Sequence, residues 1–98
     1  MSKQPSDLAR NKSNVGAASE LKVGADLIMR GYHVFRSQSP TAPCDFLIMN
    51  KEGLILRVEV RTGHLSKVNG NILVNEHGDY DVLAIVIKNT GDVHYRWK

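Results

Sequence analysis

Residues 54–61 read Leu-Ile-Leu-Arg-Val-Glu-Val-Arg, and this stretch sets the fold. Side chains alternate between the two faces of a β-strand, so the aliphatic residues 54, 56, 58 and 60 share one face. The opposite face carries Arg57, Glu59 and Arg61 together with Ile55. The stretch therefore predicts a strand that packs on a core with one face and presents charge on the other.

Downstream, residues 82–87 (Val-Leu-Ala-Ile-Val-Ile) form a continuous apolar run of strand length. Such a run is typical of a strand covered on both faces. Residues 89–92 (Asn-Thr-Gly-Asp) predict a hairpin turn into a final strand, Val93 to Trp97. Tyr95 and Trp97 share a face of that strand, which could stack on bases, fill the edge of the core or form a subunit contact.

Upstream, residues 45–49 predict another strand, joined to residues 54–61 by a turn at 50–53. Residues 32–36 alternate like a strand, and prolines break regular structure between residues 37 and 43. Between residues 62 and 79 we expect a loop, a brief strand at 72–74 and another loop. No second helix is evident there.

Residues 15–30 have helical periodicity. Ala17, Leu21, Ala25 (or Gly24) and Ile28 recur at intervals of three and four, which predicts a common packed face. Ser13 or Asn14 is the expected N-cap, and Gly31 the expected end. The order of one helix and several strands predicts an α/β domain, bordering on α+β, built on a single mixed sheet.

The chain has 98 residues, which is enough for one domain. We expect a flexible arm over residues 1–14 and the domain over residues 15–98. The single cysteine, Cys44, excludes an internal disulfide, and four scattered histidines do not indicate a zinc site. No signal peptide or membrane-spanning run is evident, so we expect an intracellular protein. A net charge of +3 is compatible with a nucleic-acid partner.

Three carboxylates occupy informative positions. Asp45 begins a strand, Glu59 lies in the middle of one, and Glu20 lies on the preceding helix. Burying a carboxylate in a strand is costly unless it is paired or binds a metal. If the two strands pair across the 50–53 turn, Asp45 and Glu59 converge at one end of the sheet. Carboxylate oxygens suit Mg²⁺, and Arg61 could stabilise charge that develops on a phosphate.

These residues carry a family resemblance that spans roughly residues 15–97. The chain resembles PD-(D/E)xK nucleases, particularly the group related to homing endonucleases and archaeal Holliday-junction resolvases. The resemblance lies in the segments Gly16–Glu20, Ala25–Phe35, Asp45–Ile48, Arg57–Thr62 and Tyr80–Val86. It departs from the family at two points: Cys44 separates Pro43 from Asp45, and Arg61 stands where the family has lysine.

The resemblance implies a restriction-endonuclease-like αβββαβ core, here trimmed, and divalent-metal-dependent cleavage of DNA, whether branched or site-specific. Asp45 and Glu59 would bind Mg²⁺, which Mn²⁺ could replace, and Glu20 would be an accessory ligand or would orient water. Arg61 would act as a fixed positive charge, because arginine cannot serve as a base. A small core of this kind predicts a twofold homodimer, with residues 93–97 as a candidate contact edge. The basic side chains expected to contact DNA are Arg36, Arg57 and Lys67.

Other interpretations remain open. Glu59 and Arg61 could form ordinary charge pairs on an exposed strand face, and Glu20 could simply be solvated. Arg61 also favours a catalytically inactive DNA-binding or protein-interaction module on a nuclease-like fold. An accessory protein of a mobile element is a third possibility, without support from particular residues. Metal dependence distinguishes the enzyme from the inactive module.

Overall fold

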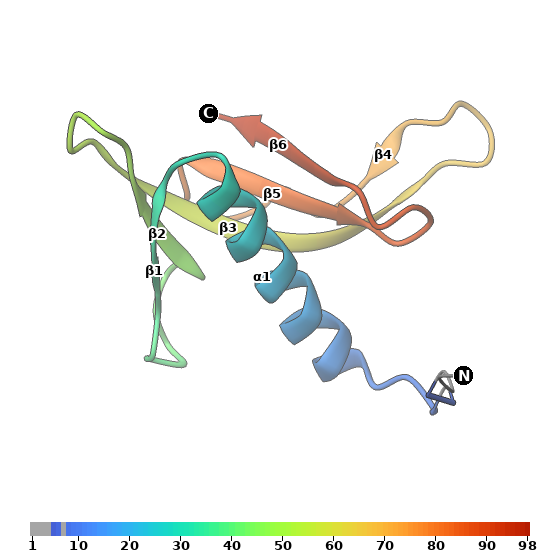
Figure 1. The fold of residues 1–98 in the computed structure, drawn as a ribbon. Helices are drawn as coiled ribbons and strands as arrows, with labels where there is room; N and C mark the ends of the chain where they lie inside the picture. The colour runs from blue at the N-terminus through green and yellow to red at the C-terminus, as the bar shows by residue number, and fades with distance from the viewer. Residues whose placement is uncertain (1–4, 7) are drawn as a thin grey trace.

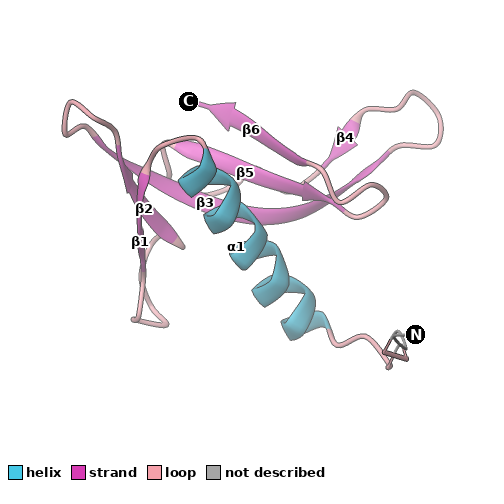
Figure 2. Ribbon diagram, viewed as in Figure 1, coloured by secondary structure: helices cyan, strands magenta, loops and turns pink. Residues whose placement is uncertain are grey.

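The computed structural model describes residues 5, 6 and 8–98, and it consists of one helix and six strands in that part of the chain (Figures 1 and 2). Most of the expected arm, residues 1–4 and 7, therefore lies outside the described residues. The elements are α1 (Lys12–Met29), β1 (His33–Arg36), β2 (Phe46–Met49), β3 (Ile55–Leu65), β4 (Ile72–Leu73), β5 (Val82–Ile87) and β6 (Val93–Trp97).

Helix α1 begins earlier than the sequence pattern predicted. Asn11, rather than Ser13 or Asn14, is the N-cap: its Oδ1 accepts hydrogen bonds from the backbone N–H groups of Ser13, at 2.9 Å, and Asn14, at 3.4 Å. The side-chain oxygen thereby satisfies N–H groups that have no partner within the first turn. Residues 12–14 consequently belong to the helix and not to an arm. Gly31 follows the helix with a φ of +98°, as expected of a glycine that ends a helix.

The packed face of α1 differs from the predicted one. Leu21 and Ile28 are 63% and 60% exposed, so the face expected to pack is turned outward. The buried residues of the helix are instead Ser19, Val23, Gly24 and Leu27. Both sets have helical spacing, and periodicity alone cannot choose between two apolar stripes. The choice depends on tertiary contacts, because the Phe46 ring packs 3.6 Å from where a Cβ on Gly24 would lie.

The strands form one mixed sheet in the order β1-β2-β3-β5-β6, with β4 paired to the end of β3. Strands β3 and β5 are parallel, and the other pairs are antiparallel. All six residues of β5 are buried, which confirms the prediction for the apolar run. The predicted turns and the final strand, Val93–Trp97, are also present. One helix with a six-stranded mixed sheet is an α+β arrangement, and α1 is the only helix among the residues described.

The two faces of the sheet are covered differently. Helix α1 crosses one face (Figure 1) and packs on a core that includes Val58, Val82 and Ala84. On the other face, Leu83, Ile85 and Ile87 are covered by Leu65, Ile72 and Val74. A short strand and a loop therefore take the place of a second helix, in agreement with the expectation of a trimmed core.

Strand β3 is longer than predicted, since it continues from Arg61 to Leu65. Gly63 lets β4 and the side chain of Ile85 approach this extension closely. A Cβ at this position would lie 2.8 Å from Ile85 Cγ2 and 3.1 Å from the Leu73 carbonyl oxygen. The brief strand expected at residues 72–74 is β4, which packs over this glycine.

The two aromatic side chains of the edge strand β6, Tyr95 and Trp97, differ in burial. Tyr95 packs against the core beneath α1, and its hydroxyl donates a 2.6 Å hydrogen bond to Asp26 Oδ2. Trp97 is 56% exposed. Of the predicted roles, filling the edge of the core therefore applies to Tyr95.

Candidate functional site

Asp45 lies immediately before β2 and is fixed by the backbone of β3. Its N–H donates to the Val58 carbonyl at 3.1 Å, and its Oδ2 accepts from the Val60 N–H at 2.8 Å. The carboxylate thus satisfies a backbone N–H of β3 just before β2 begins. Two backbone hydrogen bonds hold it in one orientation.

Glu59 is brought beside Asp45 by the register of β2 and β3. Phe46 is opposite Val58, so the preceding residue, Asp45, adjoins Glu59. The two carboxyl groups lie within hydrogen-bonding reach of each other. A hydrogen bond between them requires a proton, because two carboxylates can only accept. Burial, followed by the hydrogen bond and the negative charge of Asp45, raises the pKa of Glu59 to about 7.

The pKa of Asp45 moves in the opposite direction. Burial alone would raise it, but hydrogen bonds from Glu59, from the Val60 N–H and from Glu20 lower it below its ordinary value. The proton of the pair is therefore carried by Glu59 while Asp45 is ionised. The sequence prediction that these two side chains converge is confirmed by this geometry.

Glu20 reaches the same cluster from α1. It lies within hydrogen-bonding reach of Asp45, and its Oε2 lies 3.5 Å from Arg36 Nη2. Burial and then Asp45 raise the pKa of Glu20. The neighbouring Ser19 anchors this part of the helix to β3, since its Oγ lies 3.2 Å from Thr62 Oγ1.

Arg61 lies beside the carboxyl groups but is held by a loop. Its guanidinium donates to the carbonyl oxygen of Asn75, at 3.3 Å, and to that of His77, at 3.0 and 3.2 Å. The distance from Arg61 Nη2 to Glu59 Oε2 is 3.8 Å. Its positive charge lowers the pKa values of Asp45 and Glu59. The arginine therefore places a positive charge beside the carboxyl groups and also holds the loop at residues 75–77 through hydrogen bonds.

The basic residues expected to contact DNA lie in three different environments. Arg36 pairs with Glu20 at the site. Arg57 is bound by Asp81 through two side-chain hydrogen bonds and by Asp79 at 3.0 Å. Lys67 is exposed in the turn between β3 and β4.

The pairing of Arg57 with Asp79 and Asp81 was not predicted from the sequence. Asp81 Oδ2 also accepts a hydrogen bond from the Arg57 backbone N–H at 2.8 Å, just before the parallel pairing of β3 with β5 begins. The only sequence signal was the position of Asp81 at the start of the buried strand. The partner could not be identified without the parallel register of β3 and β5.

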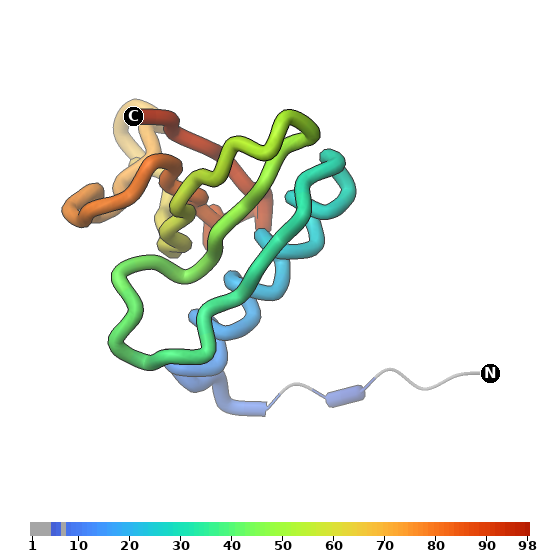
Figure 3. The backbone as a smooth tube through the Cα atoms, turned by 90° about the vertical axis from the view of Figure 1, so that its left-hand side faces the viewer, coloured from blue at the N-terminus to red at the C-terminus, as the bar shows by residue number. Residues whose placement is uncertain are grey.

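A polar cavity of about 300 Å³ adjoins Glu20 and Asp45. Its remaining walls come from Arg36 and from the segment 37–44, the loop that connects β1 to β2 (Figure 3). Cys44 also lines it, and burial followed by the charges of Glu59 and Asp45 raises the pKa of the thiol. A protonated thiol is a poor nucleophile, so the chemistry of this cavity belongs to the carboxylates.

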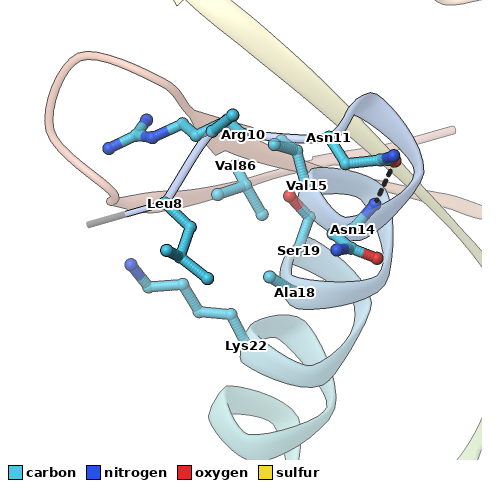
Figure 4. Close-up of a pocket in the computed structure, with 10 residues that line it drawn as sticks. Leu8, Arg10, Asn11, Asn14, Val15, Ala18, Ser19, Lys22 and Val86 are labelled. Atoms are coloured by element: carbon cyan, nitrogen blue, oxygen red, sulfur yellow. Dashed lines mark hydrogen bonds between the residues drawn. The ribbon is translucent and has the colours of Figure 1, made fainter. Parts of the chain in front are cut away.

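Figure 4 shows a different cavity, of about 390 Å³, between α1 and the segment that precedes it. Leu8, Lys22 and Val86 are among its walls, and no acidic side chain lines it. It offers none of the ligands that the sequence predicted, so it is not the candidate site.

The donor set fits a hard divalent cation in part. Within the described part of the chain, no three His, Cys, Asp or Glu side chains are gathered in a geometry that could hold a metal ion. Asp45 and Glu59 nevertheless offer two adjacent carboxyl groups, and Mg²⁺ commonly takes one or two together with water and substrate oxygens. These two residues therefore suit such an ion, and Glu20 lies beside Asp45 in the wall of the cavity.

The single helix of the described region lacks the long apolar sequence that a membrane crossing requires.

Comparisons with known proteins identify a similar fold. No family model and no curated protein matches the chain. Among solved structures, the chain is similar to a bacterial homing endonuclease, I-Ssp6803I, with a TM-score of 0.70 and 14% sequence identity. The match covers 90% of this chain and 70% of that one. The chain therefore has a nuclease-like fold, in which a single helix packs on a mixed sheet.

Proposed function

We propose that this chain is a divalent-metal-dependent endodeoxyribonuclease of the PD-(D/E)xK type. The observation that carries the proposal is the Asp45–Glu59 carboxyl pair. One member is fixed by two backbone hydrogen bonds, and the other retains a proton to a pKa of about 7. Strongly shifted carboxyl groups gathered around one point are typical of functional sites. The likeness to a homing endonuclease supports the assignment to nucleases.

In this proposal Asp45 and Glu59 hold Mg²⁺, or Mn²⁺ in its place, and Glu20 is an accessory ligand or orients water. When bound there, the ion would supply Lewis acidity to a phosphodiester and lower the pKa of an attacking water. The proton on Glu59 supports this role, because a divalent cation would relieve the repulsion from Asp45 that keeps Glu59 protonated.

Arg61 supports the reaction by its charge. Its guanidinium lies 3.8 Å from Glu59, so positive charge is already present where a phosphate would approach. The arginine cannot accept a proton, and the base must therefore be another group. Glu20 and the neighbouring Asp45 are the acceptors nearest to the cavity.

We further propose that the active form is an intracellular homodimer that acts on DNA. A domain of this size offers little surface for a duplex, and a twofold dimer would present two sites to two strands. Strand β6 is an edge of the sheet and exposes Trp97, which supports it as the contact edge.

The second candidate is a catalytically inactive module that binds DNA or protein. The hydrogen bonds of Arg61 favour this candidate, since the guanidinium donates three of them to the carbonyl oxygens of Asn75 and His77. An arginine bound in this way stabilises the conformation of the loop, whether or not the chain catalyses a reaction.

Cleavage of labelled duplex and four-way-junction DNA distinguishes the two candidates. We expect the wild-type chain to cut with Mg²⁺ or Mn²⁺ and not with EDTA, and Asp45→Asn to lose at least about a hundredfold in rate. Glu52→Gln, on the exposed 50–53 turn, is a matched control that should cut normally. If neither the wild type nor Arg61→Lys cuts with Mn²⁺, and DNA binding is the same in EDTA, the nuclease proposal is refuted in favour of the module.

A further inference from the structure

Strands β3 and β4 form a hairpin that extends beyond the rest of the sheet. Pairing between β3 and β5 ends at Gly63 and Ile87, and the next two residues, His64 and Leu65, pair only with β4. Figure 1 shows β4 and its connecting loop projecting from the end of the sheet, away from β1 and β2. The hairpin is thus a two-stranded ribbon with an open tip.

The hairpin is ordered at both its base and its tip. At the base, Leu65 and Ile72 pack against the buried side chains of β5. At the tip, Ser66 N–H donates to the Asn71 carbonyl at 2.7 Å, and Gly70 N–H donates to the Ser66 carbonyl at 2.9 Å. Gly70 has a φ of +71°, which allows the turn to close. These bonds present the tip in one shape and lower the entropic cost of binding.

The tip carries side chains suited to base edges. Lys67, Asn69 and Asn71 are exposed, and Val68 is 94% exposed. The sequence from Val60 to Asn75 contains no acidic residue, so nothing in the ribbon itself repels phosphate. An asparagine amide can bond an adenine edge, a lysine can bond guanine or phosphate, and an aliphatic group can contact a thymine methyl. This combination of exposed amides, a cation and no acid favours duplex DNA as the partner.

The length of β3 relates the tip to the carboxylate site. Lys67 lies eight residues beyond Glu59 on nearly continuous strand, which corresponds to about 26 Å at about 3.3 Å per residue. Along B-DNA, about 26 Å is roughly eight base pairs at 3.4 Å per step. The major groove is wide enough for a two-stranded ribbon.

We propose that the β3–β4 hairpin enters the major groove of duplex DNA and reads bases roughly eight base pairs from the bond that the Asp45–Glu59 site cuts. This inference rests on the proposed nuclease function for the position of the cut. Reading by the hairpin itself requires only that the chain binds duplex DNA.

Selection from a library of randomised DNA duplexes tests the hairpin. The full chain is used in EDTA, so that binding is measured without cleavage, and the enriched duplexes are sequenced. The hairpin variant carries Lys67→Ala and Asn71→Ala, which remove exposed side chains and no core contact; Asn69 is kept because its Oδ1 accepts the Asn71 N–H at 3.0 Å and orders the tip. Lys51→Ala, in the turn at the opposite end of β3, is the matched control. Circular dichroism confirms that each variant folds.

We expect the wild type and Lys51→Ala to enrich the same motif, and the hairpin variant to lose only the outer positions of that motif. Its affinity for the selected duplex should fall at least tenfold, whereas affinity for unrelated duplex should change less. Cleavage of the selected duplex with Mn²⁺ then places those outer positions relative to the cut.

Two results overturn the inference: no enriched motif for the wild type, or an unchanged motif for the hairpin variant. Metal-dependent cleavage by the wild type would survive either result, so the nuclease proposal would stand. If the motif depends on the hairpin but no metal supports cleavage, the nuclease proposal fails and base reading by the hairpin is upheld.

Discussion

Replacing Glu59 by glutamine should stabilise the metal-free protein at neutral and alkaline pH. Glu59 is forced to release its proton beside the ionised Asp45, and its pKa is consequently raised to about 7 from an ordinary value of 4.5. Glutamine has nearly the same shape and can still donate a hydrogen bond to Asp45. It carries no charge at any pH, so the repulsion disappears.

The sign follows from proton binding. Between pH 4.5 and about 7 the folded chain holds a proton on Glu59 that the unfolded chain has released. Raising the pH through this window therefore weakens the fold, and the loss is complete above the folded pKa. Asp45, whose pKa is lowered, acts in a separate window below its ordinary value of 3.8, where falling pH destabilises the fold.

The magnitude follows from the same shift. The interval from 4.5 to about 7 corresponds to roughly 3 kcal/mol at about 1.4 kcal/mol per pKa unit. The Glu59 side chain is 16% exposed, so solvent screening reduces this value, as does the opposite shift of Asp45. We expect about 1–2 kcal/mol in the free energy of unfolding.

Urea unfolding in EDTA, followed by circular dichroism from about pH 5 to about pH 8, measures the effect. Wild type and Glu59→Gln should be equally stable at the acidic end, and Glu59→Gln should be the more stable at the alkaline end. Adding Mg²⁺ at about ten times its Kd should restore about 1.4 kcal/mol to the wild type and little to the variant. Glu52→Gln, on an exposed turn, controls for the loss of one negative charge.

An equal response to pH in the wild type and Glu59→Gln would refute this reasoning, because it would mean that Glu59 titrates in the folded protein as it does in the unfolded one. A stability gain of the same size for Glu52→Gln would also refute it. The effect would then be due to net charge and not to the pair with Asp45.

Three further substitutions test the surroundings of the site. Gly63→Ala should cost about 1–3 kcal/mol in urea unfolding, because the new methyl would lie 2.8 Å from Ile85 Cγ2; unchanged stability would mean that β4 does not pack over Gly63 as described. Asp81→Asn should cost about 1–2 kcal/mol, because it weakens the hydrogen bonds that Asp81 accepts from the Arg57 side chain and backbone. Asp79→Asn should cost less in the same assay, since that side chain is 84% exposed, and equal costs would contradict the ranking.

The sheet could be predicted from sequence because its signals are local. Alternation in residues 54–61, the apolar run at residues 82–87 and the turns between strands each depend on neighbouring residues. The convergence of Asp45 and Glu59 followed from one further step, the pairing of adjacent strands across a short turn. Elements that depend on distant contacts were not predictable in this way.

The helix and the loop after β3 illustrate that limit. Leu21 and Ile28 have the spacing of a packed face, yet Val23 and Leu27 are buried because the sheet lies on their side. Likewise, nothing local indicates that Arg61 binds the carbonyls of residues 75 and 77, which lie across a hairpin from it. Sequence reasoning identified Arg61 as a departure from the pattern that the chain resembles, but it could not give the structural reason for the arginine.

That reason lies in the segment that replaces a second helix. A helix satisfies most of its own carbonyl groups, but residues 75–78 have no regular structure and need donors from elsewhere. Arg61 supplies them to Asn75 and His77, and Lys98 Nζ supplies one to Gly78 at 2.9 Å. Lysine lacks the planar fork with which Arg61 donates to the His77 carbonyl from both Nη1 and Nη2. The trimmed core and the arginine are therefore linked, and Arg61→Lys should loosen this loop whatever it does to the reaction.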